Sequence, residues 1–254
     1  MRNKFILLLF CFSSLVCFSA STDPDIKQDS MIVKYDFSVV FTCDSITSAD
    51  SVRHEHAQPL GYWGLNYDRL KIHYDSIVKH PAVANKYLAY GETQFDHKIV
   101  FFVGELKITK IEERTDSRYP GMRMGLIHGT YKFSENKEQK SSGIYAGRFT
   151  SNWLINDSLG VVYDALDYGQ PHFKNNQFRG YWKSYLTGAK QKSCWGDYRI
   201  PNSAEFDQGR KEFIPDQKHK HKGWDDYIKE HEDPSNHKAF EHEHEHWWEN
   251  THVH

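Results

Sequence analysis

Between residues 122 and 200 the chain repeatedly places a glycine two positions before an aromatic residue. Residues two apart lie on the same face of a β-strand, so in each pair the glycine, which has no side chain, leaves free space next to a large aromatic ring. Glycine weakens a strand unless close packing or a bend needs the space, and a ring from a neighbouring strand can fill that space. The pattern therefore predicts strongly curved antiparallel strands. The pairs are Gly129 with Tyr131, Gly143 with Tyr145, Gly147 with Phe149, Gly180 with Trp182, and Gly196 with Tyr198.

Polar turn-like stretches such as SENKEQKSSG and YGQPHFKNNQ separate these segments. The expected fold class is mainly β, with a curved antiparallel sheet closing to a barrel, because closure removes the exposed edge strands. A two-sheet sandwich is the alternative. The irregular spacing of the segments excludes a solenoid or a propeller.

Upstream of these pairs, two segments have strand composition and a third has helical spacing. Residues 31–43 and 97–113 are rich in Val, Ile, Phe and Tyr, which predicts two strands. Residues 80–91 carry apolar side chains at helical spacing, with Pro81 early and Gly91 at the end, which predicts a short helical insertion.

The composition changes near residue 201, where a polar stretch with two prolines predicts a linker or an irregular segment wrapped on the barrel. Beyond it, Trp224, Tyr227, Ile228 and His231 follow the spacing of one helix face. A second short helix is expected to begin at Asp233 and Pro234, where Asp can cap and Pro suits the first turn.

The first 21 residues combine Arg2 and Lys4 with an apolar run and then small residues, the pattern of a signal peptide. The protein is therefore expected to be secreted or periplasmic, and a lipid anchor at Cys17 is the less favoured alternative. No later segment reaches the roughly 20 apolar residues of a transmembrane helix. The predicted organisation is a signal peptide (1–21), a β-rich domain (22–200), and a linker with short helices and a His-rich tail (201–254).

The net charge and the cysteine content bear on nucleic-acid binding and on disulfide formation. The net charge of −2 gives no basic surface for nucleic acid. Two of the four cysteines lie in the predicted signal peptide, which leaves Cys43 and Cys194. In an oxidising compartment these two predict a disulfide, with two buried free thiols as the alternative.

The segment EHEHEHWWENTHVH, residues 241–254, concentrates imidazoles and carboxylates. If the chain is extended, alternate residues project to one side and offer several imidazoles to the same ion. Neutral imidazole suits Zn²⁺, Ni²⁺ and Cu²⁺, so we expect this segment to bind transition metal ions, with a solvated tail as the alternative. The candidate ligands are His242, His244, His246, His252 and His254.

The same segment matches H-E-x-x-H, and His252 resembles the third zinc ligand of metzincin proteases in its spacing. A zinc-dependent hydrolase using His242, Glu243, His246 and His252 is therefore an alternative function. However, Glu249 stands where that pattern has glycine, and the surrounding residues are charged. Metal binding without catalysis is the preferred interpretation.

The stretch 193–203, SCWGDYRIPNS, predicts a second site. Trp195 could stack on a small ligand while Asp197 and Arg199 hydrogen-bond it at the mouth of a barrel. The alternative is an Asp197–Arg199 pair beside a structural tryptophan. No nucleophile-elbow or phosphate-loop motif occurs, so the sequence does not predict an enzyme. The expected function is a binding protein for metal ions, with a structural envelope protein that binds a small ligand near Trp195 as a further alternative.

Overall fold

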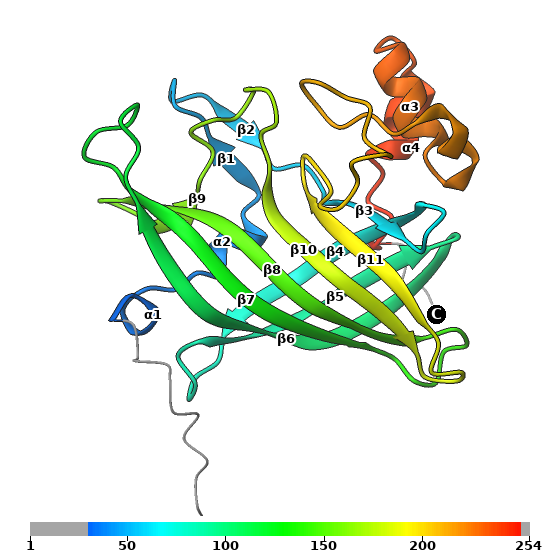
Figure 1. Ribbon diagram of the computed structural model, residues 1–254, viewed down its shortest axis with the longest axis horizontal. Helices are drawn as coiled ribbons and strands as arrows, with labels where there is room; N and C mark the ends of the chain where they lie inside the picture. The colour runs from blue at the N-terminus through cyan, green and yellow to red at the C-terminus, as the bar shows by residue number, and fades with distance from the viewer. Residues whose placement is uncertain (1–29, 250–254) are drawn as a thin grey trace, which may run out of the picture.

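The computed structural model describes residues 30–249, and this part of the chain is mainly antiparallel β-structure. Nine of its strands form a large sheet in the order β10-β11-β3-β4-β5-β6-β7-β8-β9 (Figure 1). Strand β10 pairs with β8 as well as with β11, so the pairings run partly in a ring. The short strands β1 and β2 form a separate hairpin. The prediction of a mainly β, antiparallel fold is confirmed.

The strands are β1 Ser45–Thr47, β2 Arg53–Glu55, β3 Leu60–Trp63, β4 Asp68–Lys79, β5 Lys86–Phe95, β6 Lys98–Arg114, β7 Arg123–Glu135, β8 Gly143–Asn156, β9 Gly160–Tyr163, β10 Asn175–Ser184 and β11 Lys190–Asp197. The helical elements are α1 Ser30–Lys34, α2 Val39–Thr42, the 3-10 helix η1 Gln217–Lys222, α3 Asp225–Glu232 and α4 His237–Glu243.

Aromatic side chains fill the inner face of the sheet, and glycines on neighbouring strands make room for them. The rings of Phe178 and Trp195 stack with centroids 5.0 Å apart. Gly129 pairs with Phe149 across β7 and β8, and a Cβ on Gly129 would lie 2.3 Å from two ring atoms of Phe149. The ring therefore occupies the space that a side chain at residue 129 would need.

The segment 31–43 forms two short helices, so its predicted strand is wrong. Phe37, Val40 and Phe41 have the spacing of one helix face, and all three are buried in the core. The Lys79 ammonium donates to the carbonyl oxygens of Ile32 (2.7 Å) and Tyr35 (2.6 Å), which satisfies the end of α1. Packing against the end of the sheet outweighs the strand propensity of these residues.

The predicted helix over 80–91 is also wrong, because residues 86–95 form strand β5. Tyr87 and Ala89 are fully buried on the inner face, whereas Lys86, Leu88 and Tyr90 are more exposed. The side chains therefore follow the two-residue period of a strand. The strand predicted over 97–113 is confirmed as β6.

Residues 201–249, which include α3 and α4, pack on the outer side of β3 and β11 (Figure 1). Their aromatic side chains, among them Phe206, Phe213 and Trp224, bury Tyr62 and Cys194 of these strands. The predicted helix at 224–231 is confirmed as α3. The second helix begins three residues later than the predicted Pro234 start, because the Asn236 side chain caps α4 by accepting from the Ala239 amide. Within residues 30–249 no helix is long and apolar enough to cross a membrane.

The predicted disulfide between Cys43 and Cys194 is wrong, and both are free thiols. Successive side chains on a strand face opposite sides, so Cys194 lies on the outer face of β11, next to the inward-facing Trp195. Cys43 follows α2 and packs instead with Ile46 and Tyr163. The predicted signal peptide 1–21, including Cys17, lies outside the described residues.

Candidate functional site

A cleft of about 960 Å³ runs from the end of α2, past the connection between β2 and β3, to the C-terminal segment. Its wall near α2 contains Cys43 and His56. Aromatic and charged side chains line it in roughly equal measure, which is typical of a site for a small ligand with both apolar and polar groups. The aromatic lining residues include Tyr168, Phe173, Tyr198, Phe240, Trp247 and Trp248, and the charged ones include Glu55, Arg69, Lys71, Glu230 and Glu243.

His56 carries a buried positive charge, as its hydrogen-bond partners show. Its Nε2 lies 3.1 Å from Oδ2 of Asp197, and its Nδ1 lies 3.0 Å from the carbonyl oxygen of Cys43. A carbonyl oxygen and an ionised carboxylate can only accept hydrogen bonds. Both ring nitrogens must therefore carry a proton, which makes His56 an imidazolium.

Asp197 accepts further hydrogen bonds beside this cation. Its Oδ2 also accepts from the Tyr163 hydroxyl at 3.1 Å and from the Asn176 side-chain amide at 2.7 Å. The same amide donates to the carbonyl oxygen of Val40 in α2 at 2.8 Å. The side chain of Asp197 is 1% exposed and that of His56 is 8% exposed, so the pair is shielded from water.

The pKa of His56 reflects a competition between burial and its neighbours. Burial is the largest influence and lowers the pKa, because it disfavours the charged ring. The charge and hydrogen bond of Asp197, with a smaller effect of Cys43, outweigh burial and raise the pKa from 6.5 to about 11. The imidazolium is therefore the form present at neutral pH.

Cys43 completes the arrangement on the cleft side. Its backbone is extended where it ends α2, and its Sγ lies 3.7 Å from Nδ1 of His56. The thiol, the imidazolium and the Asp197 carboxylate therefore follow one another, with the carboxylate behind the ring. No pattern in the sequence indicates this group, because the three residues come from separate segments with no motif spacing.

Three aromatic rings form the wall beside Cys43. Tyr168 contacts Phe173 and Tyr198, with ring centroids 5.6 and 5.5 Å apart, and Phe173 contacts Tyr198 at 5.1 Å. All three pack in the cluster to which Cys43 belongs. This aromatic wall, Tyr168, Phe173 and Tyr198, offers an apolar surface at the thiol end of the cleft.

The candidate metal ligands of the C-terminal segment face different carboxylates. His242 pairs with Asp226 at 3.3 Å, His244 with Glu230 at 3.0 Å, and His246 with Glu249 at 2.9 Å. Within residues 30–249 no group of three or more His, Cys, Asp or Glu side chains is arranged to hold a metal ion. His252 and His254 lie outside the described residues.

The proposed catalytic glutamate of the H-E-x-x-H string has a different partner. Glu243 forms an ion pair with Arg69 of β4, and both side chains are almost completely buried. The Arg69 guanidinium also lies 4.1 Å from the centre of the Trp224 ring. In this structure Glu243 holds α4 against the sheet, and a water-activating role would require that pair to open.

The three residues of the predicted ligand site take separate positions. Trp195 is buried in the core, where its indole N–H donates to the Tyr74 hydroxyl at 3.1 Å. Asp197 pairs with His56. The Arg199 guanidinium pairs with Asp207 and donates to the carbonyl oxygens of Gly209 (3.0 Å) and Glu212 (3.1 Å), so it fixes the irregular segment after β11.

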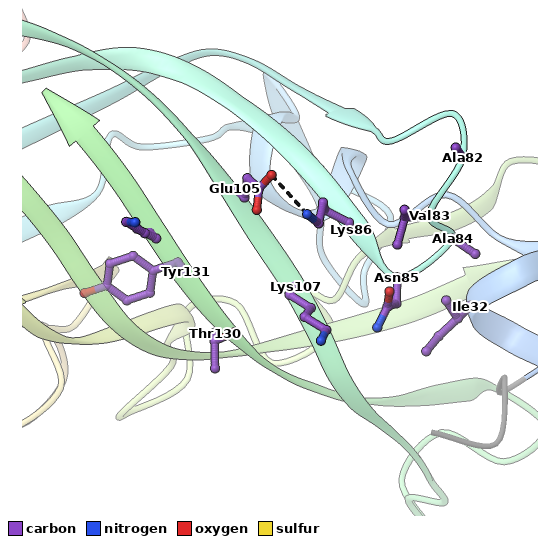
Figure 2. A pocket seen from close by; sticks show the side chains of 11 residues that line it. Ile32, Ala82, Val83, Ala84, Asn85, Lys86, Glu105, Lys107, Thr130 and Tyr131 are labelled. Atoms are coloured by element: carbon purple, nitrogen blue, oxygen red, sulfur yellow. Dashed lines mark hydrogen bonds and ion pairs between the residues drawn. The ribbon is translucent and has the colours of Figure 1, made fainter. Parts of the chain in front are cut away.

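A smaller groove of about 560 Å³ lies beside α1 and the turn before β5 (Figure 2). Its labelled side chains include Ile32, Val83 and Thr130, and an ion pair joins Lys86 to Glu105 at 3.1 Å. Lys86 and Glu105 therefore neutralise each other, and the described residues that line this groove include neither cysteine nor histidine. The cleft at Cys43 and His56 is therefore the stronger candidate site.

Comparisons with protein-family models, with curated proteins and with solved structures gave no match to this chain. The residues and the geometry of the cleft are therefore the basis on which a function is inferred.

Proposed function

We propose that the protein is a binding protein for a small organic ligand, which occupies the cleft between the end of α2 and the C-terminal segment. The observation that carries the proposal is the cleft itself, whose volume of about 960 Å³ lies in the range of small-molecule sites. In this proposal the partly ringed sheet is a barrel, and the cleft opens at its mouth. The predicted export places this function outside the cytoplasm, and the mass of the mature chain would reveal whether residues 1–21 are removed.

The C-terminal wall of the cleft is held in place before any ligand arrives. Trp224 donates its indole N–H to the carbonyl oxygen of Tyr67 at 2.7 Å, and it is fully buried. The Arg69–Glu243 ion pair fixes α4 to β4, and Trp248 stacks on His73 with ring centroids 3.9 Å apart. A preformed site loses less freedom on binding, which favours affinity.

The chemistry of the lining indicates the class of ligand. The aromatic wall suits a planar ring or an apolar chain, while Lys71 and the imidazoles can hydrogen-bond polar groups. A ligand with an apolar body and a hydroxylated end fits both parts of the cleft, and an anionic end fits only where it meets a cation such as Lys71, because carboxylates outnumber cations in the lining.

The fluorescent probe 8-anilinonaphthalene-1-sulfonate, which combines aromatic rings with a sulfonate, tests the cleft. We expect it to bind the folded protein, and Tyr168→Ala to weaken its Kd about tenfold, since an aromatic contact at the centre of a site contributes more than ~1 kcal/mol. Leu186→Ala is the control, because Leu186 is 90% exposed in the turn between β10 and β11. Equal affinities for both variants and the wild type would place the probe elsewhere and reject the proposal.

Transition metal binding by the C-terminal segment is the second candidate function. The specific observation is that His242 and His244 of the α4 region lie beside Asp226 and Glu230 of α3, so two imidazole–carboxylate pairs bridge these helices. Each pair supplies two ligand atoms of a kind that Zn²⁺ accepts. His252 and His254 would add further imidazoles.

Calorimetric titration with ZnCl₂ tests this second candidate. We expect the triple variant His242→Gln, His244→Gln, His252→Gln to bind Zn²⁺ at least tenfold more weakly than the wild type, because three imidazole ligands are lost. His237→Gln, at the exposed start of α4, is the matched control. Substitution is preferable to removing residues 241–254, because Trp247 is buried and Glu243 holds Arg69. Equal heats for the triple variant and the wild type would contradict metal binding by these residues.

A further inference from the structure

We propose that Cys43 is a nucleophile that takes the acyl group of a small ester bound in the cleft, with His56 as its acid–base partner. The proposal rests on the proposed function in one respect, since the ester must enter the same cleft. It goes beyond that function because it assigns a chemical reaction to the end of the cleft that contains Cys43.

Three contacts of His56 support the proposal. Cys43 Sγ and His56 Nδ1 are 3.7 Å apart and both residues line the cleft, while Asp197 holds Nε2 from behind at 3.1 Å. An imidazolium N–H that faces a sulfur is the arrangement that activates cysteine nucleophiles in general. The Cys43 carbonyl oxygen, 3.0 Å from Nδ1, fixes the ring plane so that the same N–H stays near the sulfur.

Two further observations separate this cysteine from a structural one. Cys43 is partly exposed and borders the cleft, whereas Cys194 is completely buried beneath the C-terminal segment. The buried charge of His56 is also costly unless it has a use or a strong partner, and Asp197 is held to its position by Tyr163 and Asn176. The cation is therefore held beside the Cys43 sulfur, where it can stabilise a thiolate.

The reaction proceeds in two balanced steps. The Cys43 thiolate forms a bond to the carbonyl carbon of the ester, the bond from that carbon to the alcohol oxygen breaks, and the leaving alcohol takes the proton from Nδ1 of His56. Water then gives a proton to Nδ1 as its oxygen attacks the acyl carbon, and the carbon–sulfur bond breaks. The products are a carboxylic acid and an alcohol, and the thiolate and imidazolium are restored.

The aromatic wall next to the thiol indicates the acyl part of the substrate. Tyr168, Phe173 and Tyr198 surround this end of the cleft with ring faces and edges. An ester with an aromatic or short apolar acyl group would place its carbonyl carbon beside Cys43. Long charged acyl groups would find no counter-charge among these three rings.

The test uses the full chain and p-nitrophenyl acetate, with p-nitrophenolate release followed by absorbance and the acetyl adduct mapped by mass spectrometry. We expect an adduct on Cys43 and continued turnover in the wild type. His56→Gln should slow adduct formation about 100-fold, the low end of the effect of a general acid–base group. Cys194→Ser, on the other face of the sheet, should leave the rate unchanged.

Since His56→Gln leaves Asp197 unpaired and could unfold the chain, iodoacetamide provides a measurement on the wild type alone. Cys43 should be alkylated at least tenfold faster than N-acetylcysteine, because the imidazolium of His56 lies beside its sulfur. An alkylation rate equal to that of N-acetylcysteine, or no acetyl adduct while the sulfonate probe still binds, would overturn the catalytic proposal alone. Loss of probe binding as well would overturn the proposed function with it.

Discussion

Asp197→Asn is expected to lower the free energy of unfolding by about 3 to 5 kcal/mol at neutral pH, the usual cost of removing one partner from a buried ion pair. The substitution keeps the size of the side chain but leaves the His56 imidazolium without its counter-charge. It also weakens the hydrogen bonds from Tyr163 and Asn176, which become bonds to a neutral acceptor. Urea unfolding followed by tryptophan fluorescence measures the change.

Asp167→Asn is the matched control for this loss. Asp167 also pairs with a cation, Arg118, but the two side chains are 39% and 58% exposed. Exposed pairs contribute less than about 1 kcal/mol, so the control should remain close to the wild type. Similar losses for the two variants would show that the His56–Asp197 pair is not the strong interaction that its burial indicates.

The same pair gives the stability a definite pH dependence. The pKa of His56 is raised in the folded state from 6.5 to about 11, so the stabilisation is fully present below pH 6.5 and is lost as the pH rises through 11. The advantage of the wild type over Asp197→Asn should therefore shrink as the pH is raised from about 7 to about 10, by at most ~1.4 kcal/mol per pH unit. An advantage that grows over this range would contradict the assignment of the charge to His56.

Gly129→Val is expected to prevent folding or to lower the free energy of unfolding by about 3 kcal/mol or more, at or beyond the upper end of ordinary overpacking. A Cβ at this position would lie 2.3 Å from the Phe149 ring and 2.6 Å from the Lys107 carbonyl oxygen. The ring lies in the packed core and the oxygen belongs to the neighbouring strand, so neither can retreat without disturbing the sheet. Circular dichroism and urea unfolding report the loss.

Thr130→Val introduces the same side chain at the next position of β7 and is the control. Thr130 is exposed and already branched at Cβ, so the change should stay within about 0.5 kcal/mol. If Gly129→Val proves insoluble, Gly129→Ala with and without Phe149→Leu tests the same contact. The smaller ring-free side chain should restore part of the stability, and no restoration would show that the aromatic ring is not what excludes a side chain here.

The sequence predicts the strands best where glycine and aromatic residues recur, and four of the five pairs lie within β7, β8 and β10. The fifth pair is wrong in part, because Tyr198 follows the end of β11 and has a positive φ. The strand prediction is wrong at residues 31–43, where Phe37, Val40 and Phe41 fit a helix face as well as a strand. The helix forms instead of a strand because these side chains pack into the core against the aromatic residues of the sheet.

The prediction is also wrong for residues 80–91, because residues 86–91 belong to a strand in place of the predicted helix. Their burial alternates with a period of two, but Ala89 and Gly91 are too small to make that alternation visible in the sequence.

The candidate site was harder to predict than the fold. His56 follows β2, Cys43 follows α2 and Asp197 ends β11, and only the folded chain brings them together. The sequence pairs Cys43 with Cys194 in a disulfide only because these two cysteines follow the predicted signal peptide. The alternation of Cys194 and Trp195 on β11 could have opposed that pairing, since the large ring had to face the core and so turned the thiol outward.

The order of strands also has a consequence for the timing of synthesis. A ribosome delivers β3 and β4 long before residues 201–249, yet the outer faces of β3 and β11 are covered by Phe206, Phe213 and Trp224 of that last segment. Strand β10, which joins β8 to β11, is likewise made late. Until residues 201–249 have been made, the nascent chain therefore exposes aromatic surface and unpaired strand edges, the features that chaperones bind in unfinished proteins.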